Sequence, residues 1–139
     1  MILDEILAAK SQELEVAKGR LPFEELEKRL RGHIALRSFR KALRKTGRLA
    51  LVAELKRKSP SRGMLRERFD PVSLAQQLEE AGASALSVLT DETFFGGHVE
   101  FMRDVQQFTE LPILRKDFVI DPYQVYEAAC YQADAVLLI

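Results

Sequence analysis

Leu49-Ala50-Leu51-Val52-Ala53-Glu54-Leu55 is a short apolar run bounded by polar residues, which predicts a buried β-strand over residues 49–55. Side chains alternate between the two faces of a strand, so Glu54 shares one face with Val52 and Lys56. A carboxylate and an ammonium group therefore leave the strand side by side at its end. Charged side chains at the end of a buried apolar strand are costly unless they pair with each other or bind a ligand. We interpret this strand end as a site for an anionic substrate.

The loop after this strand supports that interpretation. Residues 57–63 carry cations, hydroxyl groups and a flexible glycine, and the loop cannot be helical through Pro60. Such a loop offers several groups that can bind an anion, Ser59 among them.

After residue 48 the sequence alternates between strand and helix patterns. Asp70-Pro71 and Asp121-Pro122 both combine an N-cap residue with proline at the first helical position. Repeated units with continuously apolar strands indicate an α/β fold with a parallel sheet covered by helices. The expected strands are 49–55, 85–90, 112–116 and 134–139, and the expected helices are 71–81, 98–108 and 122–132.

An eight-stranded barrel of such units needs about 200–250 residues, whereas this chain has 139. Its four expected strands correspond to half a barrel. We therefore expect residues 48–139 to form the first half of a (β/α)₈ barrel, and residues 1–47 to form a helical extension that packs on it and approaches its mouth. The helices expected in this extension are 2–18, 23–30 and 37–46.

Composition limits the remaining function classes. The chain is 47% apolar and 30% charged, as is usual for soluble globular proteins. It has no apolar run of the ~20 residues that cross a bilayer, and its start lacks the basic and apolar regions of a secretory signal. The single cysteine, Cys130, suits a reducing compartment, and we interpret it as a packing residue. We expect a cytoplasmic protein that does not bind membranes.

The net charge of zero hides a basic stretch at residues 37–45, which could indicate nucleic-acid binding. Apolar residues recur through and just before this stretch as one stripe of an amphipathic helix. We therefore interpret its cations as a solvated helix face and expect no nucleic-acid partner. The stripe consists of Ile34, Leu36, Phe39, Ala42 and Leu43.

Two further strand ends carry polar or aromatic residues. Phe94 and Phe95 precede two glycines in the polar loop after strand 85–90, where they either form an aromatic surface or anchor the loop to the core. In strand 112–116, alternation places Lys116 and Phe118 on one face, the face that carries Glu54 and Lys56. In a closed barrel the two lysines and the carboxylate would gather over one cavity.

Five motifs occur in order along the chain: Ala53–Ser61, Ser87–Asp91, Phe94–Gly97, Leu114–Phe118 and Asp134–Ile139. Together they resemble the indole-3-glycerol-phosphate synthase family of tryptophan biosynthesis. The resemblance covers the whole chain, including the helical extension.

The resemblance implies a (β/α)₈-barrel carboxy-lyase, a carbon–carbon lyase. Its members convert 1-(2-carboxyphenylamino)-1-deoxyribulose 5-phosphate to indole-3-glycerol phosphate with loss of CO₂ and water, without metal or organic cofactor. By resemblance, Lys116 would be the general acid. Lys56 would be a second catalytic residue that binds the substrate carboxylate and serves as a further proton donor. Glu54 would be a third, which hydrogen-bonds the reacting centre and positions Lys56. The residues that would line the pocket of the anthranilate ring are Ser59, Pro60, Phe95, Phe118 and Leu137.

The resemblance also implies groups with no counterpart in residues 1–139: a glutamate general base, an asparagine, and a phosphate site in the loops after strands 7 and 8. The chain alone is therefore expected to be inactive. A non-enzymatic alternative is a half-barrel fragment that needs a complementary C-terminal half, or that self-associates through open sheet edges. Another alternative, a phosphoribosylanthranilate isomerase or pentose-phosphate epimerase on the same barrel, lacks the three-helix extension and the Lys56–Ser61 loop.

Overall fold

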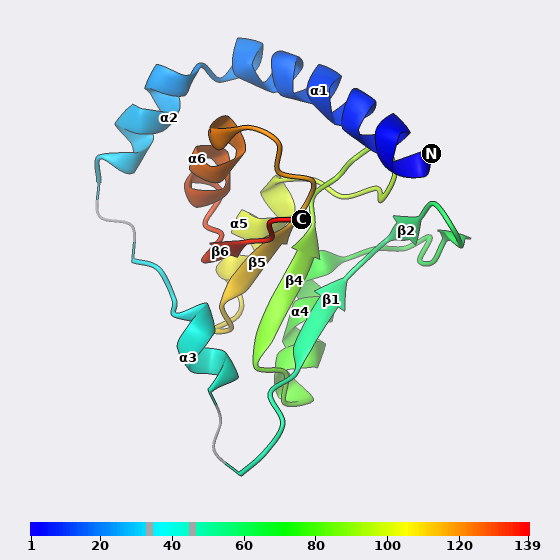
Figure 1. The fold of residues 1–139 in the computed structure, drawn as a ribbon. Helices are drawn as coiled ribbons and strands as arrows, with labels where there is room; N and C mark the ends of the chain where they lie inside the picture. The colour runs from blue at the N-terminus through cyan, green and yellow to red at the C-terminus, as the bar shows by residue number, and fades with distance from the viewer. Residues whose placement is uncertain (33–34, 45–46) are drawn as a thin grey trace.

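The computed structural model describes residues 1–32, 35–44 and 47–139. One parallel sheet lies at its centre, with its strands in chain order (Figure 1). The crossover helices between successive strands are α4 (Pro71–Glu80), α5 (Glu100–Gln106) and α6 (Pro122–Cys130). The strands of the sheet are β1 (Val52–Leu55), β4 (Ala85–Leu89), β5 (Ile113–Lys116) and β6 (Ala135–Val136). This arrangement confirms the predicted α/β class.

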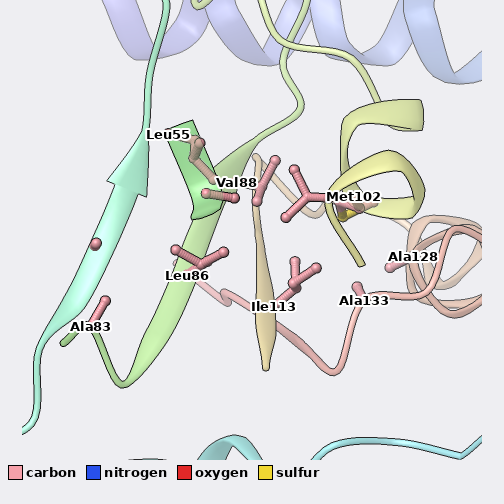
Figure 2. Packing of buried hydrophobic residues seen from close by; sticks show 11 residues of the cluster. Leu55, Ala83, Leu86, Val88, Met102, Ile113, Ala128 and Ala133 are labelled. Carbon is pink, nitrogen blue, oxygen red and sulfur yellow. The ribbon is translucent and has the colours of Figure 1, made fainter. Parts of the chain in front are cut away.

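The crossover helices share one face of the sheet, and the main hydrophobic core lies between them and the strands. Leu55, Leu86 and Ile113 of the strands pack in one cluster with residues of all three helices (Figure 2). Right-handed crossovers between strands taken in order place every helix on the same side. The opposite face carries the residues that alternate with the core, among them Glu54, which pairs in register with Ser87.

The helix starts follow the sequence signals. Asp70 accepts hydrogen bonds from the backbone N–H groups of Val72 and Ser73 at the start of α4. Asp121 accepts one from the N–H of Tyr123 at the start of α6, where Gln124 completes a capping box. These caps satisfy amide donors that have no partner inside the helix.

The N-terminal segment forms α1 (Ile2–Arg20), α2 (Phe23–Leu30) and α3 (Phe39–Leu43). Helix α1 crosses the carboxyl ends of the strands, whereas α3 lies near their amino ends (Figure 1). Helix α2 packs against α6, where Leu26 is fully buried and the Cys130 thiol lies 3.7 Å from the Leu26 carbonyl oxygen. Cys130 is therefore a packing residue, as predicted.

The basic stretch before and in α3 also has a structural role. The Arg37 guanidinium donates to the carbonyl oxygens of Leu111 and Gln106, and the Arg37 N–H donates to Asp134. Interpreting Arg37 as part of a solvated face was therefore wrong. Helix α3 is also shorter than the predicted 37–46, while Ile34 and the predicted helix end at residues 45–46 lie outside the described residues.

Two strand predictions need correction, and one pair of short strands was not predicted. The first strand begins at Val52, where its ladder to Ala85 begins, and Leu49 and Leu51 are exposed rather than buried. The last strand is only Ala135–Val136, although the N–H of Leu137 still donates to the carbonyl oxygen of Arg115. The loop after β1 contains an unpredicted hairpin of β2 (Lys58–Ser59) and β3 (Gly63–Met64). Gly63 has a φ of +65° there, which suits glycine.

No helix within the described ranges is long and apolar enough to span a bilayer.

Candidate functional site

Three charged residues meet at the carboxyl ends of the strands. The Nζ atom of Lys56 lies 3.2 Å from Oε1 of Glu54, and the Nζ atom of Lys116 lies 3.9 Å from Oε2 of the same carboxylate. Both lysine side chains are more than one third exposed. One carboxylate thus holds two accessible cations close together, which is an arrangement that can bind an anion.

The strand ladder explains why these residues meet. Glu54 pairs in register with Ser87 and Leu89 with Lys116, so β4 lies between the two charged strands. Ser87 contributes directly, because its hydroxyl donates to Oε2 of Glu54 at 3.3 Å. Sequence reasoning missed Ser87, although its place on the face of Glu54 follows from the same alternation.

Phe95 and Phe118 form an aromatic pair near these strand ends. Their ring centroids lie 6.3 Å apart at an interplanar angle of 36°, within the range of favourable aromatic contacts. Both residues are only partly buried. Two half-exposed rings side by side can offer a flat apolar surface to an aromatic ligand.

Acidic residues fix the backbone beside both rings. Oδ1 of Asp91 accepts hydrogen bonds from the N–H groups of Phe94 and Phe95, and Oδ1 of Asp117 accepts one from the N–H of Phe118. The β2–β3 hairpin joins the same loop, because the Lys58 N–H donates to the carbonyl oxygen of Phe95. The aromatic pair is therefore held by hydrogen bonds to its own backbone.

The other predicted pocket residues lie in the hairpin after β1 and just beyond β6. Ser59 lies in the hairpin, where its hydroxyl accepts from the N–H of Arg62, and Pro60 is exposed in the turn. Across the described ranges, no hydrogen bond joins Ser59 to Glu54, Lys56 or Lys116. Leu137 lies two residues beyond Ala135, which pairs with Leu114. Alternation therefore puts Leu137 on the Leu114 and Lys116 face of the sheet.

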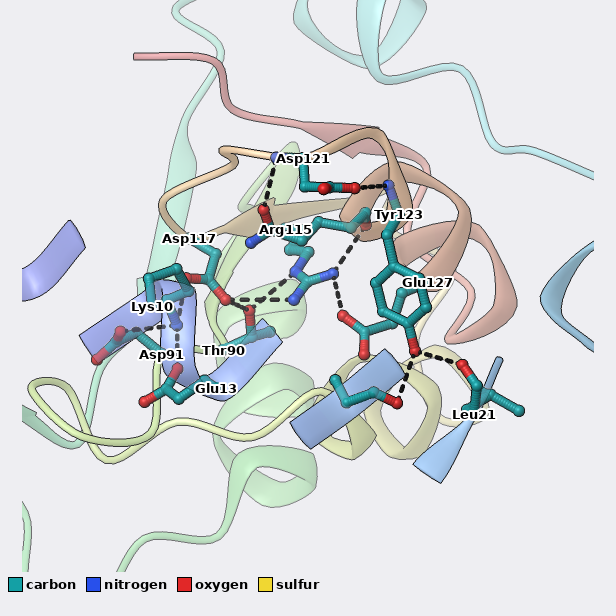
Figure 3. Close-up of polar contacts among 12 residues, drawn as sticks. Lys10, Glu13, Leu21, Thr90, Asp91, Arg115, Asp117, Asp121, Tyr123 and Glu127 are labelled. Carbon is teal, nitrogen blue, oxygen red and sulfur yellow. Dashed lines mark hydrogen bonds and ion pairs between the residues drawn. The ribbon is translucent and has the colours of Figure 1, made fainter. Parts of the chain in front are cut away.

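A second group of charges lies on the helix-facing side of β5 (Figure 3). The Arg115 guanidinium donates to Thr90, and it forms ion pairs with Asp117 at 3.3 Å and Glu127 at 2.8 Å. Burial opposes ionisation of Asp117, but Arg115 and Lys10 outweigh it and hold the pKa of this carboxyl below its ordinary value. Asp117 is thus an anion at neutral pH, and each of these charges has a partner.

Sequence reasoning missed this buried network. The available signal was that Arg115 and Asp117 alternate onto the face opposite Lys116, where a buried charge needs a partner. A second signal was Lys10, which lies four residues from both Ile6 and Leu14 on the buried side of α1. The partners themselves are distant in sequence, so the pairing could not be assigned.

A cavity of about 550 Å³ lies between α1, α6 and the loop before α5. It borders the buried network, and Glu54, Lys56 and Lys116 are not among its lining residues. The charges of Lys10, Arg115 and Glu127 at its wall are already paired. We therefore place the candidate site on the opposite face, where the lysines are accessible.

A family model and the similar curated proteins point to the same enzyme family. The family model described as indole-3-glycerol phosphate synthase matches residues 3–139. An indole-3-glycerol phosphate synthase of Carboxydothermus hydrogenoformans is 43% identical over 100% of this chain and 55% of its own length. One of Campylobacter hominis is 47% identical, over 100% of this chain and 54% of its own. The chain spans about half the length of the curated relatives it matches.

Proposed function

Because this chain belongs to the indole-3-glycerol phosphate synthase family, we propose that the protein containing it makes indole-3-glycerol phosphate from 1-(2-carboxyphenylamino)-1-deoxyribulose 5-phosphate. The reaction releases CO₂ and water and belongs to tryptophan biosynthesis. The observation that carries this proposal is the shared carboxylate of Glu54 between Lys56 and Lys116. Two cations beside an aromatic pair suit a substrate that has a carboxylate, a phosphate and a benzene ring.

The chemistry requires a proton donor at the substrate carbonyl. Ring closure joins the ring carbon that bears the carboxylate to the carbonyl carbon, so negative charge develops on the carbonyl oxygen. Lys116 is the proposed general acid that protonates this oxygen to a hydroxyl group. The hydroxyl group later takes a second proton and leaves as water, while the neighbouring methylene carbon gives up a proton to the general base. Loss of CO₂ from the same ring carbon restores aromaticity.

Lys56 and Glu54 have complementary proposed roles. Lys56 binds the substrate carboxylate until CO₂ departs, and Glu54 holds the two ammonium groups in place. Phe95 and Phe118, with Leu137 on the same face of the sheet as Lys116, receive the anthranilate ring. Ser59 and Pro60 reach the substrate from the hairpin, which the loop carrying Phe95 supports through Lys58.

We also propose a division of the chain into two parts. Residues 1–47 are the helical extension, and residues 48–139 are the first half of a (β/α)₈ barrel. The general base and phosphate site then belong to a complementary C-terminal half, since the curated relatives are almost twice as long. The small phosphorylated substrate is the proposed partner, with no nucleic acid and no membrane.

The test is turnover by the full-length protein. Purified protein is mixed with the substrate, and formation of the indole product is followed by its fluorescence while released CO₂ is measured. We expect one CO₂ for each indole formed. A folded full-length protein that releases no CO₂ would overturn the proposal, and an isomerised phosphosugar without CO₂ would favour another barrel enzyme.

A further inference from the structure

Lys10 is a buried lysine in the middle of α1. Its neighbours on the buried side of the helix are Ile6 and Leu14, and only 5% of its surface is exposed. A lysine usually keeps its ammonium group in water, and burying that charge is costly unless carboxylates surround it. The position of Lys10 therefore calls for an explanation.

Three carboxylates surround the ammonium group. Its Nζ atom lies 2.6 Å from Glu13, 2.9 Å from Asp91 and 3.0 Å from Asp117 (Figure 3). An ammonium group has three N–H donors, so these partners can use all of them. Burial lowers the pKa of Lys10, but the carboxylates outweigh it and raise the pKa above its ordinary value. Lys10 is a fixed cation.

Two of these carboxylates also organise the aromatic pair. Oδ2 of Asp91 faces Lys10, while its Oδ1 accepts hydrogen bonds from the N–H groups of Phe94 and Phe95. Oδ1 of Asp117 faces Lys10 and also accepts from the N–H of Phe118. A single ammonium group thus connects the turns that carry the two rings, and those turns come from different strand ends.

We propose that Lys10 is a positioning residue, which sets the separation of Phe95 and Phe118 and thereby the fit of the substrate's aromatic ring. The inference rests on the proposed function for its kinetic consequence. Its geometric part, the coupling of Lys10 to the ring pair, does not depend on that function. Helix α1 then takes part in forming the site, in addition to covering the strand ends.

The test compares Lys10→Met with Lys18→Met in the full-length protein. Lys18 lies on the same helix and pairs with Asp121 at 3.0 Å, at the start of α6, where Asp121 accepts from the N–H of Tyr123 rather than from that of Phe95 or Phe118. Both variants lose one cation that connects α1 to the barrel. Lys10→Met removes the ion pairs with Asp91 and Asp117, and Lys18→Met removes the one with Asp121. We expect kcat/KM to fall at least about 10-fold more in Lys10→Met, since small displacements of binding groups are costly. Most of the loss should be a higher KM.

A second readout does not require activity. Phenylalanine is replaced by 4-fluorophenylalanine, and the fluorine NMR signals of Phe95 and Phe118 are assigned by single substitutions. We expect both signals to move in Lys10→Met and to stay in place in Lys18→Met. Unmoved signals, or equal kinetics of the two variants after correction for the folded fraction, would show that Lys10 only stabilises the fold.

If Lys10→Met does not fold, Asp91→Asn replaces it. The asparagine side chain can still accept from the N–H groups of Phe94 and Phe95, while its charge toward Lys10 is lost. The same fluorine shifts and the same rise in KM are expected, and their absence would overturn the inference. If the wild-type protein has no turnover, the proposed function fails, and the fluorine signals still decide whether Lys10 controls the rings.

Discussion

Lys116 reaches Glu54 across an intervening strand, with its Nζ atom 3.9 Å from Oε2 of the carboxylate. The two residues belong to β5 and β1, and β4 lies between these strands in the sheet. Neighbouring strands are about 4.8 Å apart, so the backbones of β1 and β5 are roughly twice that distance apart. The long lysine side chain spans this gap, and its ammonium group lies above the strand ends, where a substrate can approach.

Replacing Lys116 tests its proposed role as the general acid. Lys116→Met in the full-length protein should lower kcat at least about 10²-fold, because a positioned proton donor contributes 10²–10⁴-fold to such steps. KM should change much less. The measurement is steady-state kinetics, with Lys28→Met as the control, since Lys28 lies on the surface of α2. Turnover near the wild-type value would reject the assignment.

Glu54→Gln should separate function from stability. The glutamine can still accept from the Ser87 hydroxyl, but the two lysines lose their shared counter-ion. We expect kcat/KM to fall at least about 10-fold. The free energy of unfolding should change by at most about 1 kcal/mol, because partly exposed ion pairs contribute little. Kinetics and urea denaturation give the two values, and a large loss of stability would contradict this interpretation.

Asp117→Asn should be strongly destabilising. It leaves Lys10 and Arg115 buried with one fewer anion, and removing one partner of a buried ion pair costs about 3–5 kcal/mol. Denaturant unfolding at neutral pH measures this loss. The matched control is Asp121→Asn, since the Asp121 carboxylate also forms an ion pair with a lysine but is more exposed than that of Asp117.

The pH dependence of stability follows from the lowered pKa of Asp117. A carboxylate with a lower pKa in the folded state stabilises the protein above its unfolded pKa, which is about 3.9. That contribution is lost as the pH falls through the folded-state pKa. The wild-type protein should therefore lose stability below about pH 4, and Asp117→Asn should show a flatter curve there. If the stability of the two proteins falls equally steeply below about pH 4, the ionised Asp117 is not the cause of the loss.

Alanine substitutions at two glycines should change the free energy of unfolding in opposite directions. A Cβ atom on Gly97 would clash with the carbonyl oxygen of Leu89, whereas one on Gly19 in α1 would have nothing within 4 Å. Gly97→Ala should destabilise the loop that carries Phe95 by more than about 1 kcal/mol. Gly19→Ala should stabilise the protein by up to about 1 kcal/mol. Thermal unfolding of both variants measures the difference.

A polypeptide of residues 1–139, made on its own, should associate and lack synthase activity. Within the described ranges, β1 and β6 each pair on one side only, and Leu138 and Ile139 are 72% and 80% exposed. Unpaired strand edges and exposed aliphatic side chains favour association. Light scattering and an activity assay, with and without a C-terminal half, test this. A monodisperse, active monomer would be the contrary result.

Local periodicity explains which features the sequence predicted well. The alternation of side chains along a strand is local, so it is enough to place Glu54, Lys56 and Lys116 on one face. The caps at Asp70 and Asp121 are equally local. The pairing of Phe95 with Phe118 required the order of the strands, and alternation left open whether Phe95 anchors the loop or faces a ligand.

The features that sequence reasoning missed depend on distant contacts. Lys10 meets Asp91 and Asp117, which lie more than eighty residues further along the chain, and no periodicity connects them. The predicted start of β1 was wrong for a related reason. Leu49 and Leu51 are apolar enough for a buried strand, but the ladder to β4 begins only at Val52.

The three consecutive charges of β5 and the residue after it make this strand intolerant of insertions and deletions. Arg115 and Asp117 face the helices and pair there, while Lys116 between them faces the opposite side. Adding or removing one residue before Arg115 would turn each side chain to the other face. After an insertion, the Arg115 guanidinium would take the place of the Lys116 amine beside Glu54. After a deletion, that amine would instead take the place of the guanidinium that faces Glu127. Length changes in residues 113–117 should therefore damage catalysis and folding together, whereas length changes in the exposed turn at Pro60 should affect folding less.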